Sequence, residues 1–346
     1  MTKRLVLHIG LAKTGTTSLQ HDCRRHRRLL ARQGVLYPRA MCGFAKNHSP
    51  LAAAYLAHRP HDPTIAMRVV PRAEAVAAVT AEIEASPSPV ALLSSEHFSI
   101  HFDPYEAMQL AEDFAAYAPE IVVAIREPYG RFLSMWNTQV TAGGALTLED
   151  YARTILVPDN RFISIRETLL IWRQAFGAER VHVIDWDAGD DPGAAILARC
   201  GAEAPLPGGR RRRVSLPLGA IETLRLVNEM LAVRQPSPGV APWAQRSAFS
   251  WLARQRLARM AIPKEKPIVS EQTMQALDAI HAQDSAWVAE MYGLSLASSR
   301  DRLVVGAPPP PSDAQRAAAT DLLRGVSRGL WPVSTVAVRF AGRKTR

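Results

Sequence analysis

The chain has 346 residues, and 47% of them are apolar, which is enough for a packed core in one large domain or two smaller ones. Lysine plus arginine outnumber aspartate plus glutamate by 42 to 32, so we expect an anionic ligand or surface. The 3 cysteines are widely spaced, which excludes a disulfide framework and a zinc-ligand pattern. No stretch approaches the roughly 18 consecutive apolar residues of a membrane span, and the N-terminus does not have a signal-peptide pattern. We therefore expect a cytoplasmic protein.

The first 20 residues or so predict a strand, a turn and a helix in direct succession. The apolar run from Leu5 to Ile9 is typical of a buried strand, and it ends at Gly10. A turn of small residues follows, and a helical pattern begins near Thr16 and continues toward Leu30. The N–H groups of such a turn and the positive end of the helix dipole point toward one place. The stretch therefore predicts a site for a phosphate or a similar anion.

Four more strands are expected along the chain, at residues 34–38, 90–93, 121–125 and 181–184, with helices between them. This alternation predicts an α/β fold with a central parallel sheet of about five strands flanked by helices, and a helical C-terminal half. Ligands of such sheets bind at the carboxyl ends of the strands. The prolines at 308–311 suggest a domain over residues 1–303, followed by a Pro-rich linker and basic tail over 304–346.

The order of residues in the first turn distinguishes between classes of phosphate loop. A Walker A loop has its lysine directly after the second glycine, whereas here Lys13 precedes Gly15 by two residues. This order resembles the 5′-phosphosulfate loop of bacterial sulfotransferases, which use 3′-phosphoadenylyl sulfate (PAPS) as donor. The similarity extends over roughly residues 3–296 and implies a P-loop-like sulfotransferase architecture. It implies donor contacts from the residues Lys13, Thr14, Gly15, Thr16, Thr17 and Ser18.

The resemblance also implies a second donor motif, in which an arginine ends one strand and a serine lies on the next helix. Arg126 and Ser134 match this motif, and Pro128 starts the helix between them. In sulfotransferases this pair binds the 3′-phosphate of the donor. Related enzymes fold a basic loop over the same phosphate, and the arginine run at 210–213 suggests Arg212 and Arg213 for this contact, although a solvated charge run is an alternative.

Sulfuryl transfer needs positioning and charge stabilisation more than covalent chemistry. The resemblance implies that Lys13 neutralises charge on the bridging oxygen as adenosine 3′,5′-bisphosphate (PAP) leaves, without a metal ion. The acceptor hydroxyl needs a general base within hydrogen-bond reach. Glu96, on the loop after the third strand, is the first candidate, and His48 is the second. His97 is adjacent to Glu96 and stays open as a third.

The acceptor is the least defined part of the hypothesis, and a carbohydrate or glycolipid hydroxyl is expected by analogy alone. Two other functions remain as alternatives. One is a P-loop nucleotide kinase, against which the position of the lysine argues. The other is a non-catalytic basic protein that binds nucleic acid or an anionic surface, although no nucleic-acid-binding signature is present. The basic tail is a candidate for peripheral contact with such a surface.

Overall fold

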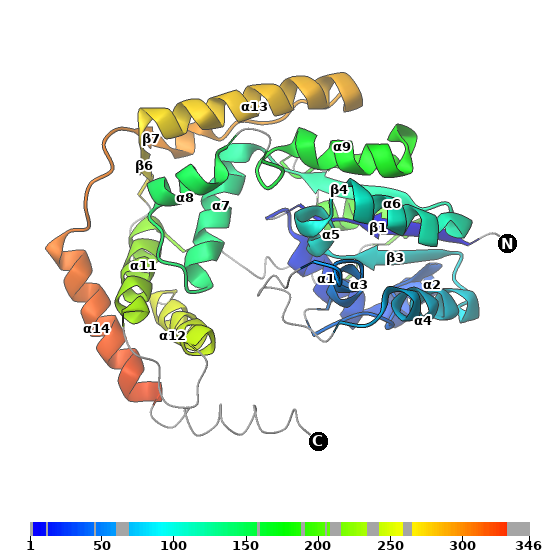
Figure 1. Ribbon diagram of the computed structural model, residues 1–346, viewed down its shortest axis with the longest axis horizontal. Coiled ribbons are helices and arrows are strands. Elements are labelled where there is room, and N and C mark those ends of the chain that lie inside the picture. Colours follow the sequence, from blue (N-terminus) through cyan, green and yellow to red (C-terminus); the bar gives the residue numbers. More distant parts are fainter. Residues whose placement is uncertain are drawn as a thin grey trace. The chain divides into compact units, whose positions relative to one another are not determined.

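The structure is a computed structural model (Figure 1), and it describes most of the chain. The described residues are 3–11, 13–44, 46–59, 69–157, 160–187, 191–204, 206–207, 216–233, 242–258 and 265–330. The chain divides into two compact units. The first consists of 1–131, 158–213 and 280–297, and the second of 132–157, 214–279 and 298–346.

The first unit is built on a five-stranded sheet with the order β2-β3-β1-β4-β5. All neighbouring strands in it are parallel. Its strands are β1 (Arg4–His8), β2 (Val35–Leu36), β3 (Val90–Ser94), β4 (Glu120–Ile125) and β5 (Val181–Asp185). This arrangement confirms the predicted α/β fold and the number and approximate position of the strands. Parallel strands covered on both faces have continuous apolar sequences, as in the middle of β1 and β4.

Alternate residues of the strands enter two separate cores on the two faces of the sheet. Leu5, Leu7 and Ile9 pack into one core, whereas Val6 packs into the other. The first core is covered by α3 (Ser49–Tyr55), α4 (Arg72–Ala85), α5 (Glu96–His101), α6 (Pro104–Asp113) and α9 (Ile165–Phe176). The second is covered by α1 (Thr16–Arg25), α2 (Arg27–Arg32) and α10 (Pro192–Arg199). The first unit therefore has three layers, with the sheet in the middle.

Two local features of the first unit differ from the sequence-based expectation. The single helix expected from residue 16 toward 30 is interrupted at His26, which lies between α1 and α2 with φ −109° and ψ 27°. The segment after β3 was expected as a loop, but it forms α5. Ser95 caps this short helix, because its side chain accepts a hydrogen bond from the backbone N–H of His97.

The second unit is mainly helical, as expected for the C-terminal half. The α-helices and strands that lie wholly in it are α8 (Leu148–Ile155), α11 (Leu218–Ala232), α12 (Pro242–Leu257), α14 (Asp313–Leu330), β6 (Ile268–Val269) and β7 (Val304–Val305). Parts of α7 (Pro128–Thr141) and α13 (Glu271–Tyr292) also belong to it. The segment expected as a linker and tail contributes β7 and α14, and α14 lies beside α11 and α12 (Figure 1). Leu226 and Val227 of α11 form a small core with Leu323 of α14.

A helix that crosses a bilayer needs both sufficient length and an apolar sequence, and the helices of the described residues fall short of this combination.

The strand order places the topological switch point of the sheet between β1 and β4. The connection after β1 leads to β2 at one edge of the sheet, whereas the connection after β4 leads to β5 at the other edge. Adjacent strands whose connections leave in opposite directions open a crevice at their carboxyl ends, where α/β proteins bind ligands. The loops that follow Ile9 and Ile125 border this crevice.

Candidate functional site

The loop between β1 and α1 has the backbone of an anion cradle. Lys13 and Gly15 are both left-handed, with φ values of 72° and 81°, and they flank Thr14. Changes of backbone handedness along a turn direct successive N–H groups to one side, which creates a concave site for an anion. A left-handed conformation is strained for a residue other than glycine, and Lys13 adopts one. Backbone strain of this kind is concentrated at functional sites.

Gly10 has to be glycine because the loop folds back closely over it. A Cβ atom at this position would lie 2.4 Å from Cγ2 of Thr16, and φ is 39°. The hydroxyl of Thr14 donates to the carbonyl of Leu11 at 2.8 Å, so this side chain fixes the turn. Thr16 is buried, whereas Thr17 and Ser18 are half-buried. Tight packing beneath the loop keeps its backbone near the strand end.

The charge around the loop is favourable for an anion. The first turn of α1 holds no acidic residue, and no side chain caps its N-terminus at Gly15. The first N–H groups of a helix have no intrahelical acceptor, and they carry the positive end of the helix dipole. Lys13 adds a full positive charge. The resulting site has the chemistry that a phosphate or sulfate group requires.

Arg126 follows β4 directly and lies on the other side of the switch point. Its guanidinium carbon is 4.2 Å from the centre of the Trp186 ring, which is a stacked cation–π contact. Trp186 continues the line of β5, because its backbone N–H donates to the carbonyl of Ile125 at 2.9 Å. Its indole Nε1 would lie 3.5 Å from a Cβ at Gly15. Trp186 therefore connects the loop after β1 to Arg126.

Two carboxylates lie close to Arg126 and moderate its charge. Burial raises the pKa of Asp187, and the positive charge of Arg126 opposes that rise. Glu127 is buried and accepts a hydrogen bond from the backbone N–H of Gly130 at 2.9 Å, so it caps the start of α7. A phosphate would have to compete with these groups for the guanidinium.

Glu96 is the first residue of α5, directly after β3. Its Oε2 accepts hydrogen bonds from Nε2 of Gln20 at 2.9 Å and from Nδ2 of Asn47 at 3.1 Å. The β1–β3 register pairs His8 with Ser94, so Glu96 follows the strand adjacent to the one that ends at the anion loop. Glu96 is half-buried. Its position at the carboxyl edge fits a residue that faces substrate.

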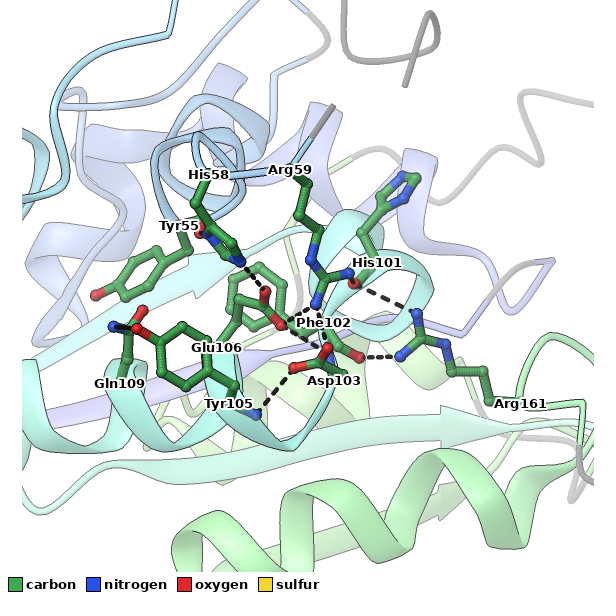
Figure 2. Close-up of polar contacts among 10 residues, drawn as sticks. All are labelled: Tyr55, His58, Arg59, His101, Phe102, Asp103, Tyr105, Glu106, Gln109 and Arg161. Carbon is green, nitrogen blue, oxygen red and sulfur yellow. Dashed lines mark hydrogen bonds and ion pairs between the residues drawn. The ribbon is translucent and has the colours of Figure 1, made fainter. Parts of the chain in front are cut away.

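A cluster of charged side chains fixes the other end of α5 (Figure 2). Arg59 donates to the carbonyl of His101 at 2.8 Å, and Arg161 donates to the carbonyl of Phe102. Cations at a helix C-terminus satisfy its last carbonyls and interact favourably with its dipole. Arg59 also pairs with the buried carboxylate of Glu106, whose pKa is raised mainly by burial. The helix that carries Glu96 is thus held at both ends.

His48 has its ring fixed by two hydrogen bonds in the core. Its Nδ1 accepts from the backbone N–H of Ser94 at 3.0 Å, and its Nε2 donates to the carbonyl of Pro38 at 3.3 Å. The residue is 0% exposed, and burial lowers its pKa to about 4. Both ring nitrogens of His48 thus have backbone partners, which disfavours His48 as a general base relative to Glu96.

The stability of the protein should fall with acid before most carboxylates titrate. Burial lowers the pKa of both His8 and His48 to about 4, from 6.5. Between these values the unfolded chain binds more protons, so stability is complete above pH 6.5 and declines as pH falls toward 4. The shift corresponds to about 3 kcal/mol for each histidine at most. Urea unfolding at pH 7, 5.5 and 4.5 measures this decline.

His48→Gln is the informative variant for this acid effect, because carboxylates titrate equally in both proteins. Its stability should depend on pH less steeply than that of the wild type in this range, because His8 and His182, whose pKa values burial also lowers, remain. Equal slopes for the two proteins would contradict the assignment of His48 as a buried neutral histidine.

The other site residues predicted from the sequence are Ser134, Arg212, Arg213 and His97, and they lie in different parts of the chain. Ser134 lies on α7 in the part that belongs to the second unit, and it is half-buried. Arg212 and Arg213 lie outside the described residues. The ring of His97 stacks on that of His101, with 5.2 Å between their centres.

Trp186 and Gln20 were not predicted from the sequence. A single aromatic residue after a strand and a glutamine within a helix belong to no motif that indicates a binding site.

Comparisons with known proteins gave one similar structure. No family model matches the chain, and no curated protein sequence matches it. The chain is similar to a crystal structure of a sulfotransferase from Alicyclobacillus acidocaldarius, at 15% identity and a TM-score of 0.43. The alignment covers 68% of this chain and 98% of that chain. A likeness at this level identifies neither the family nor the activity, so we base the proposed function on the residues of the site.

Proposed function

We propose that the protein is a sulfotransferase that moves the sulfuryl group of PAPS to a hydroxyl or amine of an acceptor. The proposal rests mainly on the residue order and the backbone conformation of the loop that follows β1. Its lysine precedes Gly15 instead of following it, and its backbone is left-handed at Lys13 and Gly15. The lysine order disfavours an ATP-binding Walker A loop.

The donor fits the chemistry of the residues around the switch point. The 5′-phosphosulfate requires N–H donors and a cation, and the loop from Lys13 to Ser18 offers both. The 3′-phosphate requires a second cation at a distance, and Arg126 at the end of the adjacent strand is suited to this role. Gly10 and Gly15, both with positive φ, allow the tight backbone path of this loop. Ser134, Arg212 and Arg213 remain proposed contacts of the 3′-phosphate.

The reaction proposed is an in-line displacement at sulfur. A new bond forms between the acceptor oxygen and sulfur, while the bond from sulfur to the bridging oxygen breaks and PAP leaves. Lys13 neutralises the charge that develops on the bridging oxygen. Glu96 accepts the proton of the acceptor hydroxyl as the oxygen attacks. A carbohydrate or glycolipid is the proposed acceptor class.

The proposal can be tested with the full chain and sulfur-labelled PAPS. Incubation with separate panels of glycans, glycolipids and phenols should give labelled product with at least one class, in buffer that contains EDTA. A parallel incubation with phosphorus-labelled ATP and magnesium should give none. Phosphoryl transfer from ATP without sulfuryl transfer from PAPS would contradict the proposal and favour a kinase.

A further inference from the structure

We infer that Gln20 and Asn47 are positioning residues that hold one oxygen of Glu96 and direct the other toward the acceptor. Both amide groups donate to the same atom, Oε2, at 2.9 and 3.1 Å. In the described part of the chain, no hydrogen bond reaches the other carboxylate oxygen, Oε1. The inference deepens the proposed function and depends on the role of Glu96 in it.

The orientation of the Gln20 amide is fixed by two acceptors. Its Nε2 donates to Oγ of Ser94 at 3.2 Å as well as to Glu96, so both amide hydrogens are used. A flipped amide would place its carbonyl oxygen against the carboxylate, which is repulsive. Ser94 lies in turn 2.8 Å from Nδ1 of His8. Gln20, Ser94 and His8 are 0–1% exposed, so solvent does not compete for the contacts of Ser94 with Gln20 and His8.

The orientation of the Asn47 amide is fixed in the same way. Its Oδ1 accepts from the hydroxyl of Ser49 at 2.6 Å, which leaves the Nδ2 end for Glu96. Asn47 and Ser49 are also buried. The carboxylate of Glu96 is therefore anchored by two rigid donors that come from separate segments of the chain, α1 and the turn before α3.

The position of Gln20 connects the base to the anion loop. Gln20 lies on the same helix as Thr16 and Thr17, one turn further along. This helix thus carries three of the proposed donor contacts, Thr16, Thr17 and Ser18, together with the group that holds the base. This arrangement fixes the distance between the bound donor and Glu96. In-line displacement at sulfur requires such a fixed distance.

A double-mutant cycle separates a positioning role from a structural one. Gln20→Met removes the donor while preserving side-chain length, and kcat should fall about tenfold. Glu96→Gln should lower kcat by about 10²-fold or more. If Gln20 acts through Glu96, adding Gln20→Met to Glu96→Gln should change kcat by less than about twofold. The affinity for PAP, measured by calorimetry, should stay within about threefold of the wild type in each variant.

Two further variants keep the test decisive. Gln275→Met makes the same substitution at an exposed glutamine and should have no effect on kcat. Gln20→Asn keeps the amide but shortens its reach, and it replaces Gln20→Met in the cycle if that variant does not fold. If the fold losses of kcat in the two single variants multiply in the double variant, Gln20 does not act through Glu96 and the positioning role is wrong. PAP binding and sulfuryl transfer by the wild type would still support the proposed function in that case. Absence of PAP binding by the wild type would overturn both.

Discussion

Replacing Lys13 with alanine should lower kcat for sulfuryl transfer by about 10²–10³-fold. The reason is that Lys13 is the cation of the loop after β1, and charge develops on the bridging oxygen only as the bond to sulfur breaks. PAP lacks the sulfuryl group, so its affinity should fall less than the rate. Alanine tolerates the left-handed backbone at this position no worse than lysine does, so the fold should persist. Initial rates of labelled transfer and PAP calorimetry measure the two effects.

The matched control for this variant is Lys266→Ala, which removes an exposed lysine from the second unit. Its transfer rate should equal that of the wild type within error. A Lys13→Ala protein that transfers sulfate at the wild-type rate would show that the loop lysine does not take part in the reaction.

Replacing Asp284 with alanine should cost about 3–5 kcal/mol of unfolding free energy. Asp284 is 0% exposed and accepts hydrogen bonds from the hydroxyl of Ser164 and the backbone N–H groups of Ile165 and Arg166, at 2.9–3.0 Å. It therefore caps the start of α9 from a separate helix. Burial raises its pKa, while the backbone N–H donors and Arg131 oppose that rise. The substitution leaves several buried donors without an acceptor.

Urea unfolding at pH 7 measures this loss, and Asp278→Ala provides the comparison within α13. Asp278 pairs with Arg300 at the surface, with 2.9 Å between Oδ1 and Nε. Surface pairs contribute about 1 kcal/mol or less, so this variant should remain close to the wild type. Equal losses for the two variants would show that the buried cap at α9 does not carry the stability assigned to it.

The strands and the first loop could be predicted because their signals are local. The apolar run at Leu5–Ile9 and the residues Gly10 and Gly15 follow from rules about burial and left-handed turns. The helical break at His26 had no such signal, because no glycine or proline occurs there. The helix that begins at Glu96 is short and is stabilised by groups distant in sequence, such as Arg59 and Arg161.

The candidate site was only partly predictable for a related reason. Lys13 and Arg126 stand at the ends of strands, so topology alone brings them to one edge of the sheet. Trp186 and Gln20 make contacts across the sheet edge, and these depend on the register of β4 with β5 and of β1 with β3. For His48 the sequence indicated a loop residue, whereas the structure buries it, because its ring satisfies the backbone of Pro38 and Ser94.

We propose that the loop after β1 and Arg126 together bind the two phosphates of a PAPS-type donor. Calorimetric titration of the full chain with PAP, in EDTA and without magnesium, tests this claim most directly. We expect a Kd for PAP on the order of 1 μM or below, and a loss of affinity of at least about tenfold in Arg126→Ala. A wild-type protein that does not bind PAP, or that binds ATP with magnesium in its place, would show that this site does not bind a PAPS-type donor.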